Sequence, residues 1–202
     1  MRDLAQDPKT DTASLQDIAV NADADSEILF SIILNPNVNA ATLTLMASNT
    51  NSKIVTPAVL AAIAAHTKAD QSTLLAVTQN FHASAEALIA SASNPNVDPV
   101  VLNHIACHPN ANTTVLSTVV AHPKTNTLTL VEITYNHNAD ATILAAIPDH
   151  PNVDAATSRL LNLSTPTGKA ITYSYTGAET GLTSEDAKKK LTLNRSKLQR
   201  KR

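Results

Sequence analysis

His108-Pro109-Asn110-Ala111-Asn112-Thr113-Thr114-Val115-Leu116 is the clearest copy of a pattern that recurs along most of this chain. Its leucine has counterparts in the same register: Leu15, Leu29, Leu43, Leu60, Leu74, Leu88, Leu102, Leu116, Leu130 and Leu144. Successive leucines are fourteen residues apart, except for three extra residues between Leu43 and Leu60. A fixed internal period predicts a repeat protein, in which each unit packs against its neighbours.

A short polar residue stands four positions before each of these leucines. The residues in this register, including one after the last leucine, are Asp11, Asp25, Asn39, Thr56, Asp70, Ser84, Asp98, Asn112, Asn126, Asp140 and Asp154. Side chains of this kind accept hydrogen bonds from the free amides at a helix start, so each is predicted to be an N-cap. An apolar residue such as Val97 before the cap, with Leu102 four after it, matches a hydrophobic staple.

Apolar residues fall four, seven and eight positions after each cap, as in Leu102, Ile105 and Ala106, which is a helical stripe. The next turn ends the helix after about nine residues, roughly 13 Å. So short a helix is stable only when neighbours hold it. We therefore expect an all-α fold: an α-solenoid of about eleven fourteen-residue units that pair as 28-residue hairpins.

Two classes of unit alternate along the chain. Apart from Pro109, proline opens only units of one class, at Pro8, Pro36, Pro95, Pro123 and Pro151. Three residues after the cap, these units carry mainly Ser or Thr (Ser14, Thr42), whereas the others carry Ile, Val or Ala (Ile28, Val59). This difference predicts a wider apolar face on one class of helix, and it suggests an inner and an outer helix in each hairpin.

No glycine precedes Gly168, although helix ends often turn through a left-handed residue that glycine suits best. The Asn or His that opens each turn has two interpretations. It takes the left-handed conformation, or its side chain bonds the unpaired carbonyls of the turn.

Composition places limits on the class of protein. Aromatic residues make up only 2% of the chain against 43% hydrophobic residues, so the core must be thin layers of aliphatic side chains. Cys107 is the one cysteine, which excludes an internal disulfide. The sequence has no apolar stretch long enough to span a bilayer and no secretory signal at its start, so we expect an intracellular, cytoplasmic protein.

Charge is divided unevenly along the sequence. Residues 1–163 hold fourteen Asp and Glu against six Lys and Arg, and residues 164–202 hold three against nine. We expect residues 1–163 to form the solenoid and residues 164–202 to be a flexible linker rich in Ser and Thr, followed by a basic tail. The basic candidates for binding are Lys188, Lys189, Lys190, Arg200, Lys201 and Arg202. The tail is interpreted as a solubilising end, as a contact for nucleic acid or anionic lipid, or as a nuclear import signal in a eukaryotic host.

Histidine is the first residue type to suggest a metal. Most of the seven histidines lie in the repeated turn, where Asn replaces His freely, so we interpret them as structural. His104, Cys107 and His108 form the one local group with ligand types. A soft metal site needs four ligands, and no second cluster supplies the rest, so neither a metal nor a cofactor is expected.

Motifs of catalysis are not found in the sequence. It has no glycine-rich phosphate loop, no Gly-x-Ser-x-Gly elbow and no His-Glu-x-x-His. The capping role explains nearly half of the carboxylates. We therefore expect a protein that is not an enzyme.

The stretch 108–116 resembles the opening half of the bacterial variant leucine-rich repeat, and residues 94–106 and 122–134 resemble it too. The resemblance implies an α-superhelix related in shape to HEAT repeats, and a bacterial or bacterium-derived source. This chain departs from the family in lacking the second half-repeat with its arginine. It also lacks the cysteine cluster that binds an iron–sulfur centre in one such protein, so no cluster is implied.

Exposed helix positions differ most from unit to unit, which is what a binding surface on a constant frame needs. The candidates are Gln16, Asp17, Asn103, His104 and Glu132. We predict a scaffold that binds a protein or peptide, such as a bacterial effector or adaptor. The alternative is a nucleic-acid-associated protein that binds through its basic tail. The same variation is also expected at positions that face water and change in sequence without a functional reason.

Overall fold

The computed structural model describes residues 1–21, 23–51, 53–154 and 157–158. The chain divides into two units, residues 1–169 and 170–202, and every described residue belongs to the first. The described residues form α-helices and one short 3-10 helix, without a strand among them. The all-α prediction is therefore confirmed, whereas the predicted boundary at residue 163 and the whole segment 164–202 lie outside the described residues.

The helices are short and evenly spaced. They are α1 (Arg2–Gln6), α2 (Thr12–Ala19), α3 (Ser26–Leu34), α4 (Ala40–Ala47), α5 (Pro57–Ala65), α6 (Gln71–Gln79), α7 (Ala85–Ser93), α8 (Pro99–Cys107), α9 (Thr113–Ala121), α10 (Thr127–Thr134), α11 (Ala141–Ala146) and the 3-10 helix η1 (Ile147–Asp149). From α2 to α10 each helix has eight or nine residues, as the spacing of caps and turns predicts.

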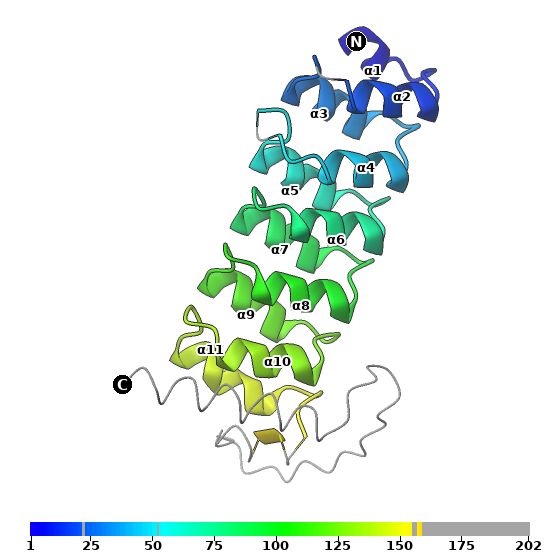
Figure 1. Ribbon diagram of the computed structural model, residues 1–202. Helices are drawn as coiled ribbons and strands as arrows, with labels where there is room; N and C mark the ends of the chain where they lie inside the picture. Colours follow the sequence, from blue (N-terminus) through cyan, green and yellow to red (C-terminus); the bar gives the residue numbers. More distant parts are fainter. Residues whose placement is uncertain (22, 52, 155–156, 159–202) are drawn as a thin grey trace. The chain divides into compact units, whose positions relative to one another are not determined.

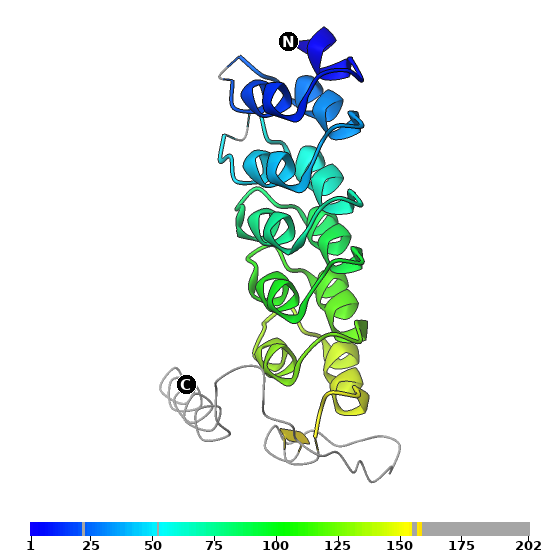
Figure 2. The same ribbon diagram turned by 90° about the vertical axis from the view of Figure 1, so that its right-hand side faces the viewer.

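These helices form two columns. Each helix packs against the helix two places along the chain, so that α5 lies on α7 and α4 lies on α6. Figures 1 and 2 show the odd column (α1, α3, α5, α7, α9, α11) beside the even column (α2, α4, α6, α8, α10). One layer is thus a hairpin of one odd and one even helix, and the 28-residue unit predicted from the sequence is the structural repeat.

The repeating leucines form the core between the columns. Nine of the ten, from Leu15 to Leu130, are completely buried. Leu144 is half-buried; it lies on α11, a helix of six residues that is followed directly by η1. The three extra residues lie in the turn between α4 and α5, so the helices on both sides keep their columns.

All the predicted N-caps have the expected geometry. From Asp11 to Asp154, each capping side chain accepts a hydrogen bond from the backbone N–H three residues later. In α8, for example, Asp98 Oδ1 lies 2.8 Å from the Val101 nitrogen, and Pro99 fills the first helical position, where its missing N–H costs nothing.

The odd helices do carry the wider apolar face, but the position that makes the difference is also buried on most even helices. Thr42, Thr73 and Thr129 of the even helices are completely buried, like the apolar residues at the same position in the odd helices. Each hydroxyl donates to the Oδ1 of its own N-cap residue, at 2.9 Å. Because this local bond satisfies the hydroxyl, threonine is buried there without an unpaired polar atom.

Candidate functional site

The turns between helices are built around one side chain. Asn35, the C-cap of α3, has φ −70° and ψ 132°, and its Oδ1 accepts a hydrogen bond from the Asn37 N–H at 2.9 Å. Asn94 has the same extended backbone and accepts from the Asn96 N–H. The interpretation that these residues take a left-handed conformation is therefore wrong.

The amide of the same asparagine reaches the preceding layer. Asn94 Nδ2 donates to the carbonyl oxygens of Ala64, at 2.7 Å, and His66, at 3.1 Å. Asn96 Nδ2 donates to the Ala69 carbonyl, at 2.8 Å. Equivalent bonds join turn to turn along both edges of the stack, and we call each series a turn ladder. The interpretation in which these side chains bond turn carbonyls is correct, but the carbonyls belong to the preceding layer.

Histidine and lysine take the place of asparagine in the ladders. His108 Nδ1 accepts from the Asn110 N–H at 3.0 Å, and its Nε2 lies 3.3 Å from the Asn80 carbonyl oxygen. Lys68 Nζ donates to the carbonyls of Pro36, at 2.7 Å, and Val38, at 2.8 Å. Sequence reasoning missed the ladders, although the interchange of Asn and His at one position was their signal.

Position in the ladders affects the titration of the histidines. Burial lowers the pKa of His66, His108 and His122 below the ordinary value. The positive charges of Lys68 and Lys124 lower the pKa of His66 and His122 further, because two positive charges repel. The turns therefore favour neutral imidazole rings.

The candidate metal ligands His104, Cys107 and His108 have different surroundings. Both ring nitrogens of His108 are engaged in the ladder, whereas Cys107 is exposed and His104 is half-buried on α8. Among the described residues, no group of three or more His, Cys, Asp or Glu side chains is placed to hold a metal ion.

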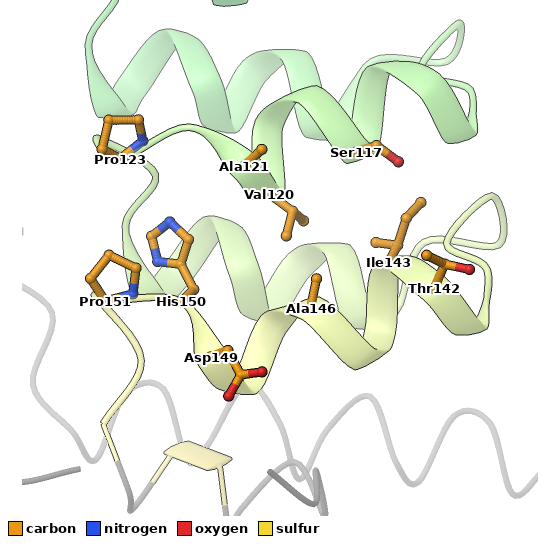
Figure 3. Close-up of a pocket in the computed structure, with 10 residues that line it drawn as sticks. All are labelled: Ser117, Val120, Ala121, Pro123, Thr142, Ile143, Ala146, Asp149, His150 and Pro151. Carbon is orange, nitrogen blue, oxygen red and sulfur yellow. The ribbon is translucent and has the colours of Figure 1, made fainter. Parts of the chain in front are cut away.

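A groove of about 510 Å³ lies between α9 and α11. Its walls are formed by Val120, Ala121, Ile143 and Ala146, with His150 at one end (Figure 3). The ring of His150 is part of a ladder, since its Nε2 lies 3.1 Å from the His122 carbonyl oxygen. The groove is thus an apolar hollow at the end of the odd column, and its imidazole has a structural partner.

The predicted binding residues on helices all lie on the even column. Gln16 and Asp17 are on α2, Asn103 and His104 on α8, and Glu132 on α10, each five or six residues after an N-cap. They share one helical register, but they do not form one contiguous site, because α2 and α8 are three layers apart. Asn103 also has a structural role, since its Nδ2 donates to Thr129 Oγ1 at 3.4 Å. The basic residues 188–190 and 200–202 lie outside the described residues.

We define the even face as the positions two, five, six and nine after the cap on α2, α4, α6, α8 and α10. It carries four of the exposed large apolar side chains in the part of the chain that the structure describes: Val20 (58% exposed), Leu45 (39%), Val100 (50%) and Tyr135 (38%). From α5 to α11 the odd column instead exposes mainly small residues, such as Ala58, Ala65, Ser93 and Ser117. From α5 onward the two columns therefore expose different side chains, whereas at the start of the odd column Leu4 on α1 (56% exposed) and Leu34 on α3 (82%) are large and apolar.

No helix within the described ranges is both long enough and apolar enough to cross a membrane. Comparisons of the chain with protein-family models, with curated proteins and with solved structures gave no match. The resemblance to the variant leucine-rich repeat therefore stays a prediction.

Proposed function

We propose that this protein is a non-enzymatic repeat scaffold that binds a protein or peptide partner along the even face. The observation that carries the proposal is the contrast between the columns from α5 onward: the even column exposes Val100 and Tyr135, whereas the odd helices expose mainly small side chains. Scattered exposed apolar residues are ordinary on a protein surface, but a series of them on one face is typical of an interaction site.

The densest part of the even face lies on α8 and α10, which pack against each other. Residues 28 positions apart are neighbours in the column, which places Val100 beside Leu128, His104 beside Glu132, and exposed Cys107 beside Tyr135. The apolar side chains thus lie toward the two ends of these helices, with the polar pair His104 and Glu132 between them, and Tyr135 is of a residue type that is enriched in binding hot spots.

Charge favours a basic partner. Asp17 and Glu132 lie on the even face, and residues 1–163 carry a net charge of about −8, from fourteen acidic and six basic residues. Complementary charge speeds the encounter of two proteins and disfavours partners of like charge. The expected ligand is therefore a basic segment with one or two large apolar anchors.

Selection of peptides from a displayed random library against the intact chain tests this proposal. Selected peptides should combine Lys or Arg with apolar anchors, and the double variant V100S/Y135S should weaken their binding at least about tenfold, since each anchor contact is worth about 1 kcal/mol or more. A matched control on the odd face, T114A/S117A, should bind like the unchanged protein. Equal loss in both variants, or none in either, would contradict a site on the even face.

The basic clusters 188–190 and 200–202 support a second candidate function, the binding of nucleic acid through the tail. Its affinity for a mixed oligonucleotide should fall steeply with salt, because basic side chains displace counterions from the phosphates. Removal of residues 185–202 should abolish this binding. Tight binding by the shortened chain would refute this candidate and would place the nucleic-acid site on the solenoid.

A further inference from the structure

Four turn histidines share one geometry: His66, His108, His122 and His150. In each, Nδ1 accepts a hydrogen bond from the backbone N–H two residues later, with nitrogen–nitrogen distances of 3.0 to 3.1 Å. In His108 and His150 the other ring nitrogen, Nε2, faces a carbonyl oxygen of the preceding layer. Only a neutral ring with its proton on Nε2 makes both bonds, because an imidazolium is a donor at both nitrogens.

We propose that His66, His108 and His122 make the stack acid-sensitive, so that their protonation opens these turns while the asparagine turns stay closed. A second proton would sit on Nδ1 and point at a backbone N–H, which turns an attraction into a repulsion. That N–H then loses its acceptor, in a part-buried bond at His108 and in exposed bonds at His66 and His122. Layers joined through these turns would then keep the packing of their helices and the bonds of Lys68, Asn110 and Lys124, but would lose the bonds of the histidine.

The asparagine turns provide the comparison within the same molecule. Asn35, Asn80, Asn94 and Asn136 accept the same backbone hydrogen bond and donate to the preceding layer, but an amide does not titrate in this range. After His66, histidine turns become more frequent along the chain, with three of the four at residue 108 or later. Acid should therefore loosen mainly the layers from α9 onward.

Charged groups on and around these turns do not reverse the effect. The titratable groups on the turns themselves and on the turns stacked against them are Lys68, Asp70, His82, Asp98, Lys124, His137, Asp140, Asp149 and Asp154. Lys68 and Lys124 oppose a positive charge on His66 and His122, and His150 also opposes one on His122. Of the acids, Asp70, Asp98, Asp140 and Asp154 direct Oδ1 to an amide of their own helix.

The direction of the pH dependence follows from the lowered pKa of His66, His108 and His122. An unfolded chain takes up these protons near the ordinary pKa of 6.5, before the folded chain does. Stability is therefore complete above about pH 6.5 and is lost as the pH falls from there toward the lowered pKa of the folded state. Each such histidine raises the unfolding constant by up to about tenfold per pH unit in that window.

Amide hydrogen exchange of the intact chain at about pH 7.5 and about pH 5, corrected for the intrinsic rates, tests the proposal turn by turn. The N–H groups of Lys68, Asn110 and Lys124, which donate to these three histidines, should lose protection in acid at least about tenfold more than the reference amides. Those references are the N–H groups of Asn37, His82, Asn96 and Asn138, which donate to asparagine. Equal loss in the two sets would overturn the proposal.

Replacement of the histidines gives an independent measurement. The variant with all four turn histidines changed to Asn should fold, because other layers use Asn at this position, and its urea midpoint should be almost the same at both pH values. If it does not fold, H108N and H122N alone should each remove part of the pH dependence. The control H104Q/H137N changes two histidines whose Nδ1 does not accept the turn hydrogen bond. This variant should keep the pH dependence of the urea midpoint. A four-site variant as acid-sensitive as the original chain would refute the proposal.

Discussion

Each turn needs one side chain that accepts a hydrogen bond on one side and donates on the other. Asparagine does this with its amide oxygen and nitrogen, and neutral histidine with its two ring nitrogens, which explains why both occur at one position. The first turn carries Asp7 instead, whose Oδ1 accepts from the Lys9 N–H.

The accepting and donating roles of Asn94 can be tested separately by replacing its amide nitrogen with an oxygen. N94D keeps an acceptor for the Asn96 N–H but replaces the donor that binds the Ala64 and His66 carbonyls with an oxygen that repels them. Loss of these bonds should lower the free energy of unfolding in urea by about 1–3 kcal/mol. N94H keeps both the acceptor and the donor at neutral pH, so its free energy of unfolding should fall clearly less. Equal stability of the two variants and the unchanged chain would mean that the ladder contributes nothing.

Roles within one turn and helix could be predicted from the sequence, and roles between layers could not. Asp98 caps a helix that begins at the next residue, so its neighbours in the sequence reveal the function. Asn94 instead bonds residues 28 and 30 positions earlier, and no local pattern contains both partners. The candidate binding residues show the same limit: the sequence identified variable positions, but not that they share the even column, nor that all except Asp17 are half-buried.

At the scale of the element, these helices depend on their neighbours. Eight or nine residues are too few for a helix to persist alone in water, so stability comes from the buried leucine layers. The even helices add hydroxyl contacts to this packing: Thr44 Oγ1 and Thr73 Oγ1 are 2.8 Å apart, between α4 and α6. The sequence did not reveal that threonine belongs to the interior, because its hydroxyl has a partner that only the cap geometry supplies.

Truncation of a core leucine tests this dependence. L102A removes a completely buried side chain and should lower the free energy of unfolding by about 2–5 kcal/mol. L144A, at the half-buried end of the series, is the matched control and should cost clearly less, because its site is already partly open to solvent. Similar small losses of under about 0.5 kcal/mol for both would mean that the leucines do not form the core.

At the scale of the stack of residues 1–158, the repeat is the hairpin and not the single helix. Odd helices contact odd helices and even contact even, so a fourteen-residue unit has two structural roles that alternate. The leucine period alone predicted fourteen, and the alternation of prolines added the pairing into 28. Which surface binds a partner depends on this pairing, because the even face exists only where even helices lie side by side.

Deletion of whole units tests this pairing most directly. Removal of residues 70–97 joins Ala69 to the cap Asp98 and takes out α6 and α7, so the remaining helices keep their columns. Removal of residues 84–97 takes out α7 alone and moves every later helix into the other column, where the packing at the junction is mismatched. The measurement is urea unfolding followed by circular dichroism. The longer deletion should fold with a single transition, and the shorter one should be less stable than it by about 1–3 kcal/mol despite its extra helix. A shorter deletion as stable as the longer one, or more stable, would contradict the two-column account.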